Sequence, residues 1–259
     1  MKIPLYQIDA FTDKLFGGNP AAVCPLESWP EDELMQNLAA ENNLSETAFF
    51  VKNDFGYTLR WFTPEMEIDL CGHATLASAF VLFNYLNFTQ DKIIFDTKSG
   101  ILEVTKENGL ITLDFPATKP WPEKAPKQLL KGLGAKPAEV LRSRDYLAVF
   151  DEEDEILAIK PDFEILKKLD ALGIIITAPG KEADFVSRFF APAAGINEDP
   201  VTGSAHVTLV PYWSERFSRK KLHAFQLSKR KGELFCTDAD DRVLISGNAV
   251  TYSIGAVVI

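Results

Sequence analysis

Cysteine is scarce in this chain, and the few cysteines present form no pairing pattern. The three residues, Cys24, Cys71 and Cys236, are an odd number, and none belongs to a Cys-x-x-Cys motif. This usage argues against a disulfide framework and against a zinc knot built on paired cysteines. The sequence therefore predicts reduced thiols and a cytoplasmic protein.

Long apolar runs and an excess of basic charge are also missing. No stretch reaches the ~20 apolar residues that a membrane helix needs, and the N-terminus has no apolar export segment, which predicts a soluble protein without a membrane partner. The 27 basic and 37 acidic residues give a net charge of −10, which disfavours binding to nucleic acid. Because 46% of the residues are hydrophobic, with 19 Phe, the chain can fill substantial cores and is not predicted to be disordered.

The chain contains one pattern twice. Arg60-Trp61-Phe62-Thr63-Pro64 recurs as Arg188-Phe189-Phe190-Ala191-Pro192, and Gly72-His73-Ala74 recurs as Gly203-Ser204-Ala205, with a connector three residues longer in the second copy. The recurrence predicts one supersecondary unit used twice. Each copy is predicted to be a strand, a bend at proline, and a helix opened by glycine.

The helix after Gly72 is apolar on nearly every side, which is typical of a helix inside a core. The first backbone N–H groups of a helix have no intrahelical partner, so a buried helix start is a potential anion site. If the two copies face each other, the starts at Gly72 and Gly203 converge on one cleft. The alternative is that both glycines simply make tight turns.

The duplication and a proline-rich segment predict the domain organisation. We expect a first lobe over residues 1–116, a linker over 117–126, and a second lobe over 127–259. The last strand, 250–259, has no counterpart in the first lobe, so a crossing back to that lobe is one possibility. Within the second lobe, the pattern predicts short helices at 128–133 and 138–141, a strand at 156–159 and a helix at 162–172.

A carboxylate occupies an unusual place in the predicted strand over 44–51. Glu46 shares one strand face with Ala48 and Phe50. Burial there would be costly and would favour proton transfer by this group. The alternative is that Glu46 lies at a strand edge, either solvated or paired with an arginine.

Four motifs together resemble the PhzF-like phenazine-biosynthesis family of the diaminopimelate-epimerase superfamily. They are Gly18-Asn19-Pro20-Ala21-Ala22-Val23, Ser45-Glu46-Thr47, the stretch from Arg60 to Ala74, and Glu198-Asp199-Pro200-Val201-Thr202-Gly203-Ser204-Ala205-His206. They follow the family's order along the whole chain. The resemblance identifies a fold and a family, and it says much less about the substrate.

The resemblance implies an α/β fold of two pseudo-symmetric lobes, each a curved, mostly antiparallel sheet wrapped round a central helix. It also implies a homodimer with a site in the interlobe cleft and with neither metal nor organic cofactor. The implied activity is that of an isomerase or epimerase that moves a proton at carbon in a small, carboxylate-bearing substrate.

The resemblance also implies roles for particular residues. Glu46 would be the general base and acid, with His73 and Asp199 as further catalytic residues. The backbone at Gly72 and Gly203, together with Ser204 and Asn19, would bind substrate. Simpler roles are a helix cap for His73 or Ser204, and a turn residue for Asp199 or Asn19.

Cys71 leaves a second mechanism open. Related epimerases use two thiols on opposite faces of the substrate, and Cys71-Gly72-His73 resembles their first cysteine motif. The equivalent segment of the second copy, Asp199 to Gly203, has no cysteine, so a two-thiol mechanism would lack its partner. One-thiol epimerisation by Cys71, or a non-catalytic ligand-binding protein with the same fold, are the alternatives.

Overall fold

The computed structural model describes residues 2–259, which divide into two compact units. One unit comprises the residues up to Phe115 together with Ile245–Ile259, and the other comprises Pro116–Leu244. The segment predicted as a linker therefore lies inside the second unit. There it contributes strand β9 (Trp121–Pro122), which pairs with a neighbouring strand because proline is tolerated at a sheet edge.

The first unit is built on a mixed, mostly antiparallel sheet. Strand β1 (Lys2–Ala10) pairs antiparallel with both β2 (Asn19–Leu26) and β18 (Ala249–Val258), so the last strand of the chain belongs to this unit. β2 runs parallel to β3 (Glu46–Lys52), and β3 runs antiparallel to β4 (Tyr57–Phe62). β4 then pairs with the short antiparallel β5 (Glu67–Ile68) and the parallel β6 (Lys92–Thr97), followed by β7 (Gly100–Glu107) and β8 (Leu110–Pro116).

The second unit repeats this order of pairing. β10 (Glu139–Arg142) pairs antiparallel with β11 (Tyr146–Val149), which runs parallel to β12 (Ile174–Pro179). β12 is antiparallel to β13 (Phe185–Ala191), and β13 pairs with the short antiparallel β14 (Ile196–Asp199) and the parallel β15 (Lys221–Gln226). β16 (Gly232–Ala239) follows antiparallel to β15, and β17 (Arg242–Gly247) contains the boundary between the units.

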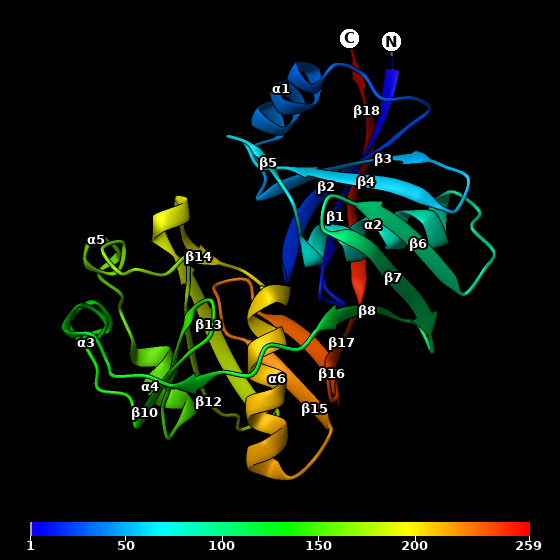
Figure 1. Cartoon of the computed structure of the whole chain (residues 1–259). Coiled ribbons are helices and arrows are strands. Elements are labelled where there is room, and N and C mark those ends of the chain that lie inside the picture. The colour runs from blue at the N-terminus through cyan, green and yellow to red at the C-terminus, as the bar shows by residue number, and fades with distance from the viewer. Residues whose placement is uncertain (1) are drawn as a thin grey trace. The chain divides into compact units, whose positions relative to one another are not determined.

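In each unit one long helix follows the short strand and packs against the sheet. α2 (Gly72–Tyr85) contacts β1, β2 and β3, and its residues from His73 to Ala79 are all buried. α6 (Gly203–Phe217) packs against β15 and β16, as Figure 1 shows for both helices. The predicted fold class, with a mostly antiparallel sheet and a central helix in each lobe, is confirmed.

The remaining helices cover the sheets. α1 (Asp32–Asn42) buries Met35 and Leu38 in a cluster with Phe49 and Phe62. In the second unit, α3 (Lys127–Leu133), α4 (Glu153–Ala158) and α5 (Phe163–Leu166) pack around a core that includes Tyr146, Phe150 and Phe190. A 3-10 turn, Pro192–Ala194, separates β13 from β14. Among residues 2–259, no helix combines the length and the apolar character that crossing a membrane requires.

The duplication extends to an ion pair. Arg60 on β4 places Nε 2.7 Å from Glu67 Oε1 on β5, and Arg188 on β13 places Nε 2.7 Å from Glu198 Oε1 on β14. The hydrogen bond from Arg60 lowers the pKa of Glu67. In both units, therefore, an arginine on the repeated strand forms a charge-assisted contact with a glutamate on the short neighbouring strand.

Three of the local predictions in the second unit are wrong. Residues 139–142 form strand β10 instead of a helix, because they pair with β9 on one side and β11 on the other. Residues 153–158 form helix α4, which a capping box between Glu152 and Glu155 begins. The helix predicted over 162–172 is only the single turn α5.

Candidate functional site

A glycine turn places Asn19 at the start of β2. Gly18 has φ +59°, and a Cβ built on it would lie 2.0 Å from the carbonyl oxygen of Ala10, so only glycine fits there. Asn19 follows as the first residue of β2, and it is fully buried. Its side chain is therefore part of the interior of the first unit.

Glu46 is the first residue of β3, opposite Ala21 of the parallel strand β2. Only 7% of the residue is exposed, which rules out the solvated strand edge considered from the sequence. Glu46 makes an ion pair with His73, and His73 Nε2 lies 3.0 Å from Glu46 Oε2.

His73 is the second residue of α2, and its ring joins the side chains predicted as a site. In addition to the contact with Glu46, the amide nitrogen of Asn19 lies 3.2 Å from His73 Nδ1. The sulfur of Cys71 lies 3.5 Å from the same ring nitrogen. Cys71 is the N-cap residue of α2, and no side chain caps this helix start, so His73 is not a capping residue. The first unit thus brings together four of the predicted residues.

Burial and charge set the protonation of this cluster. Burial, with a smaller effect from the Glu46 charge, raises the pKa of Cys71 to about 11, so the thiol is protonated at neutral pH. Burial alone would lower the pKa of His73, yet Cys71 and Glu46 raise it well above its ordinary value. Because the thiol is uncharged near neutral pH, the Glu46 carboxylate is the charge that favours the imidazolium there.

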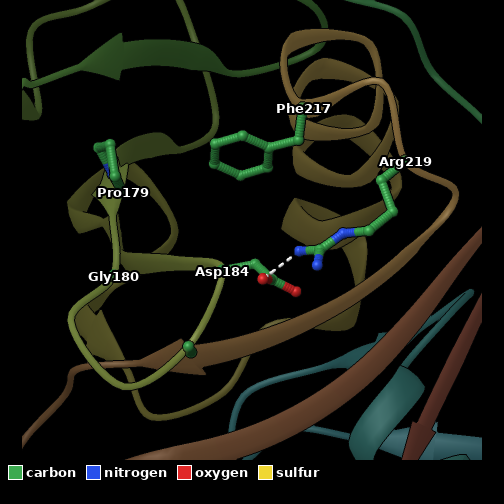
Figure 2. Close-up of a pocket in the computed structure, with 6 residues that line it drawn as sticks. Pro179, Gly180, Asp184, Phe217 and Arg219 are labelled. Atoms are coloured by element: carbon green, nitrogen blue, oxygen red, sulfur yellow. Dashed lines mark ion pairs between the residues drawn. The ribbon is translucent and has the colours of Figure 1, made fainter.

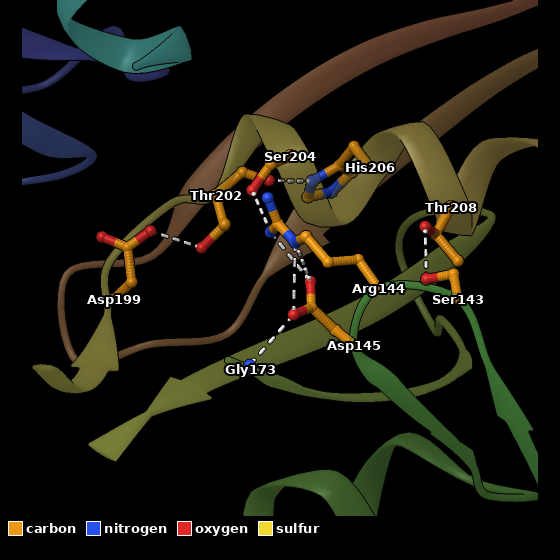
Figure 3. A network of polar contacts seen from close by, with 9 residues as sticks. All are labelled: Ser143, Arg144, Asp145, Gly173, Asp199, Thr202, Ser204, His206 and Thr208. Carbon is orange, nitrogen blue, oxygen red and sulfur yellow. Dashed lines mark hydrogen bonds and ion pairs between the residues drawn. The ribbon is translucent and has the colours of Figure 1, made fainter. Parts of the chain in front are cut away.

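The predicted residues of the second unit gather at the start of α6 (Figure 3). The Thr202 hydroxyl donates a short hydrogen bond to the carboxylate of Asp199, at the end of β14. Ser204, the second residue of α6, accepts a hydrogen bond of 3.2 Å from Arg144 Nη2, and no side chain caps the helix. Ser204 is therefore not a cap, whereas Asp199 does bond within its own turn.

Sequence reasoning missed three side chains that support this arrangement. Arg144 pairs with the buried Asp145, whose Oδ1 accepts a hydrogen bond of 2.9 Å from the backbone of Gly173. The buried Gln226 side chain accepts a hydrogen bond from the Thr202 backbone at 2.9 Å and donates to the Asp199 carbonyl at 2.8 Å. An isolated Arg-Asp pair and a strand glutamine carry no sequence signal for such contacts.

His206, on the next turn of α6, is a buried histidine that stays neutral. Its Nδ1 lies 2.8 Å from the carbonyl of Thr202, which can only accept, so Nδ1–H donates. Burial lowers the pKa of His206 to about 4. The charged form is thus disfavoured in the folded protein.

We expect His206 to make the stability of the chain depend on pH. An unfolded histidine titrates near 6.5, so between about pH 6.5 and about pH 4 the unfolded chain binds a proton that the folded chain does not. Stability should be full above that window and should fall by up to roughly 3 kcal/mol as the pH drops through it. Urea unfolding at pH 7, 5.5 and 4.5 measures this loss.

The variant His206→Asn, which keeps a donor and removes the titration, should flatten the pH dependence. His223→Asn is the matched control, since His223 is half-buried and paired with Glu233, and it should keep the loss. An unchanged slope in His206→Asn would contradict the assignment.

A separate hollow of about 450 Å³ lies in the second unit and is lined by Pro179, Gly180, Ala183, Asp184, Phe217 and Arg219. Figure 2 shows that its two charged side chains, Asp184 and Arg219, are paired with each other. Asp184 also accepts a hydrogen bond of 2.7 Å from the His223 backbone. None of the residues predicted as functional lines this hollow.

Comparisons with known proteins agree with the fold and with the motifs. The model of the phenazine biosynthesis-like protein family, PhzC-PhzF, matches residues 8–255. An uncharacterized isomerase of Pseudomonas aeruginosa is 51% identical over 255 residues, or 98% of each chain. A crystal structure of a PhzF-family phenazine biosynthesis protein from Enterococcus faecalis superposes with a TM-score of 0.98 at 48% identity, covering 100% of both chains.

A more distant structure shares the fold alone. It is a hydroxyproline epimerase from Agrobacterium vitis with bound trans-4-hydroxy-L-proline, which superposes with a TM-score of 0.65 at 12% identity. The match covers 99% of this chain and 92% of the epimerase.

Proposed function

We propose that Glu46 transfers a proton at a carbon atom of the substrate. The premise is that this chain belongs to the phenazine biosynthesis-like family and is an isomerase. The substrate in this proposal is a small metabolite that carries a carboxylate. The observation that carries the proposal is a buried carboxylate, 3.0 Å from an imidazole whose pKa is raised. A non-catalytic role is set aside, because the named relatives are isomerases.

The proposed reaction has two proton transfers. In the first, the Glu46 carboxylate accepts the proton of a substrate C–H bond, and the electron pair of that bond moves into the neighbouring carboxylate or enol system. In the second, the carboxylic acid of Glu46 returns a proton to the same carbon or to a neighbouring one, and the electrons return to carbon. His73, 3.0 Å from Glu46 Oε2, would orient the carboxylate for the first step.

Negative charge on the substrate needs donors nearby. The uncapped start of α2 at Gly72 offers backbone N–H groups beside Glu46 and His73. We propose Gly203, Ser204 and Asp199 as the substrate-binding set of the second unit, with Arg144 orienting the Ser204 hydroxyl at 3.2 Å. Cofactor independence and a homodimer are proposed on the family resemblance alone.

Asn19 has a revised role in this proposal. The sequence suggested that it touches substrate, but its side chain is fully buried and lies 3.2 Å from His73 Nδ1. We propose that Asn19 positions the His73 ring and does not contact the substrate.

The thiol alternative has less support. A one-thiol epimerase needs Cys71 as a thiolate, whereas burial raises the pKa of Cys71 to about 11. Glu46 therefore remains the better candidate for the base at neutral pH.

Solvent deuterium incorporation tests the proposal. The full chain, kept in EDTA, is incubated in D₂O with a panel of small carboxylates that includes cyclic amino acids, and mass spectrometry follows the gain of one mass unit. Cys71→Ala should retain exchange within about tenfold of the unsubstituted chain, since the thiol is not the base. Loss of exchange in Cys71→Ala, with exchange retained in Glu46→Gln, would establish the thiol mechanism instead.

A further inference from the structure

Three chemically different donors meet at one buried point of the first unit. The carboxylate of Glu46, the thiol of Cys71 and the imidazole of His73 have donor atoms within 4.8 Å of one another. All three residues are more than nine-tenths buried. They come from the start of β3 and the start of α2.

Two of these donors are unsatisfied. In the part of the chain that the structure describes, buried Glu46 Oε2 and buried His73 Nε2 have no hydrogen-bond partner of good geometry, although they lie 3.0 Å apart as an ion pair. A buried polar atom without a hydrogen bond costs about 1–3 kcal/mol. Neither atom gives the other a well-aligned hydrogen bond, so both have a lone pair that a shared ligand can use.

We propose that this cluster is a binding site for a divalent cation of the zinc class, with Glu46, Cys71 and His73 as its three protein ligands. Sulfur, imidazole nitrogen and carboxylate oxygen are the ligands that zinc prefers, and three protein ligands leave a fourth position open. A thiolate and a carboxylate balance the charge of a dication, so the occupied site is neutral, as a buried site requires.

The distances place the ligand atoms close enough for one ion after small side-chain adjustments. Zinc bonds of about 2.0–2.3 Å place tetrahedral ligand atoms about 3.3–3.6 Å apart. His73 Nε2 and Glu46 Oε2 are 3.0 Å apart, and one ligand atom of each of the three residues lies within 4.8 Å of the others. The ion would sit on Nε2, beside Glu46, and the Cys71 side chain would turn toward it.

Asn19 completes the arrangement. Its amide lies 3.2 Å from His73 Nδ1, the nitrogen that the ion does not use. An amide presents both a donor and an acceptor, so its oxygen can accept from Nδ1–H once the ion occupies Nε2. A hydrogen bond to the second ring nitrogen is how proteins orient histidine ligands of metals.

Occupation of the site has a consequence for the proposed function. An ion on Glu46 would cover the oxygen that carries the proton, so the loaded chain should be an inhibited isomerase. The inference uses the residues of the proposed function, but the binding itself is measurable whether or not the chain turns over any substrate.

Cobalt(II) provides the test, because a cobalt–thiolate bond absorbs in the near ultraviolet. Co²⁺ is titrated into the reduced full chain without chelator, and Zn²⁺ is then added as a competitor. We expect one equivalent of Co²⁺ to bind with a thiolate band that Zn²⁺ removes. Cys71→Ala should lose the band, whereas Cys24→Ala and Cys236→Ala, which remove buried thiols elsewhere, should keep it.

Two further variants report on the other ligands. Glu46→Gln should weaken Co²⁺ binding by about 100-fold while keeping the band, and Asn19→Ala should weaken it by about 10–100-fold. Thermal melts in EDTA establish that each variant is folded. No saturable binding, or an undiminished band in folded Cys71→Ala, would overturn the proposal. Failure of the isomerase proposal would appear separately, as absent deuterium exchange in EDTA.

Discussion

Replacing Glu46 with glutamine should lower solvent deuterium incorporation by about 10²–10⁴-fold. Glutamine keeps the shape of the side chain but cannot accept a proton at neutral pH. The position is buried, so water cannot easily replace the missing base. Mass spectrometry of a substrate found in the exchange panel, incubated in D₂O and EDTA, measures the rate.

A matched change elsewhere separates chemistry from general effects. Glu103→Gln alters a half-exposed carboxylate on β7 that pairs with Lys92, and it should leave exchange unchanged. A thermal melt establishes that Glu46→Gln is folded, since glutamine keeps the shape of the buried side chain but removes the ion pair with His73. Exchange at an undiminished rate in folded Glu46→Gln would refute Glu46 as the proton carrier.

The sequence predicted the architecture because the duplication left a readable pattern. The Arg-x-Phe-x-Pro stretches mark β4 and β13, and the paired glycines mark the starts of α2 and α6. These features recur because both units need the same strand, the same bend and the same helix start. The residues alone pointed to Glu46, a carboxylate on an apolar strand face, whereas its grouping with His73 and the candidate role of Cys71 followed from the resemblance to the PhzF-like family.

Other features depend on partners that a sequence does not specify. Residues 139–142 form a strand only because β9 and β11 lie on either side. The apolar residues near 156–159 suggested a strand, but the Glu152 and Glu155 side chains cap a helix there. At the start of α6, Arg144 comes from 60 residues away. Such contacts follow from tertiary pairing, which overrides local propensity.

The repeated ion pairs should differ in their contribution to stability, although their sequences match. Arg188 is 12% exposed at its side chain, and besides Glu198 it donates to the carbonyls of Ile156 and Ile159 at 3.0 and 2.9 Å. Arg188→Ala would leave a carboxylate and two carbonyls without this donor. We expect a loss of about 3–5 kcal/mol in the free energy of unfolding.

For Arg60→Ala the loss in the free energy of unfolding should be smaller, about 1–2 kcal/mol. Its partners Glu67 and Asp32 still contact another cation or water after the substitution. Glu67 retains a contact with Lys98 at 2.5 Å, and Asp32 is 73% exposed at its side chain. Urea unfolding of both variants at pH 7 measures the difference, and Lys98→Ala combined with Arg60→Ala should raise the cost toward that of Arg188→Ala. Equal losses in the free energy of unfolding for Arg188→Ala and Arg60→Ala would contradict the prediction. They would show that the hydrogen bonds from Arg188 to the carbonyls of Ile156 and Ile159 add no net stability.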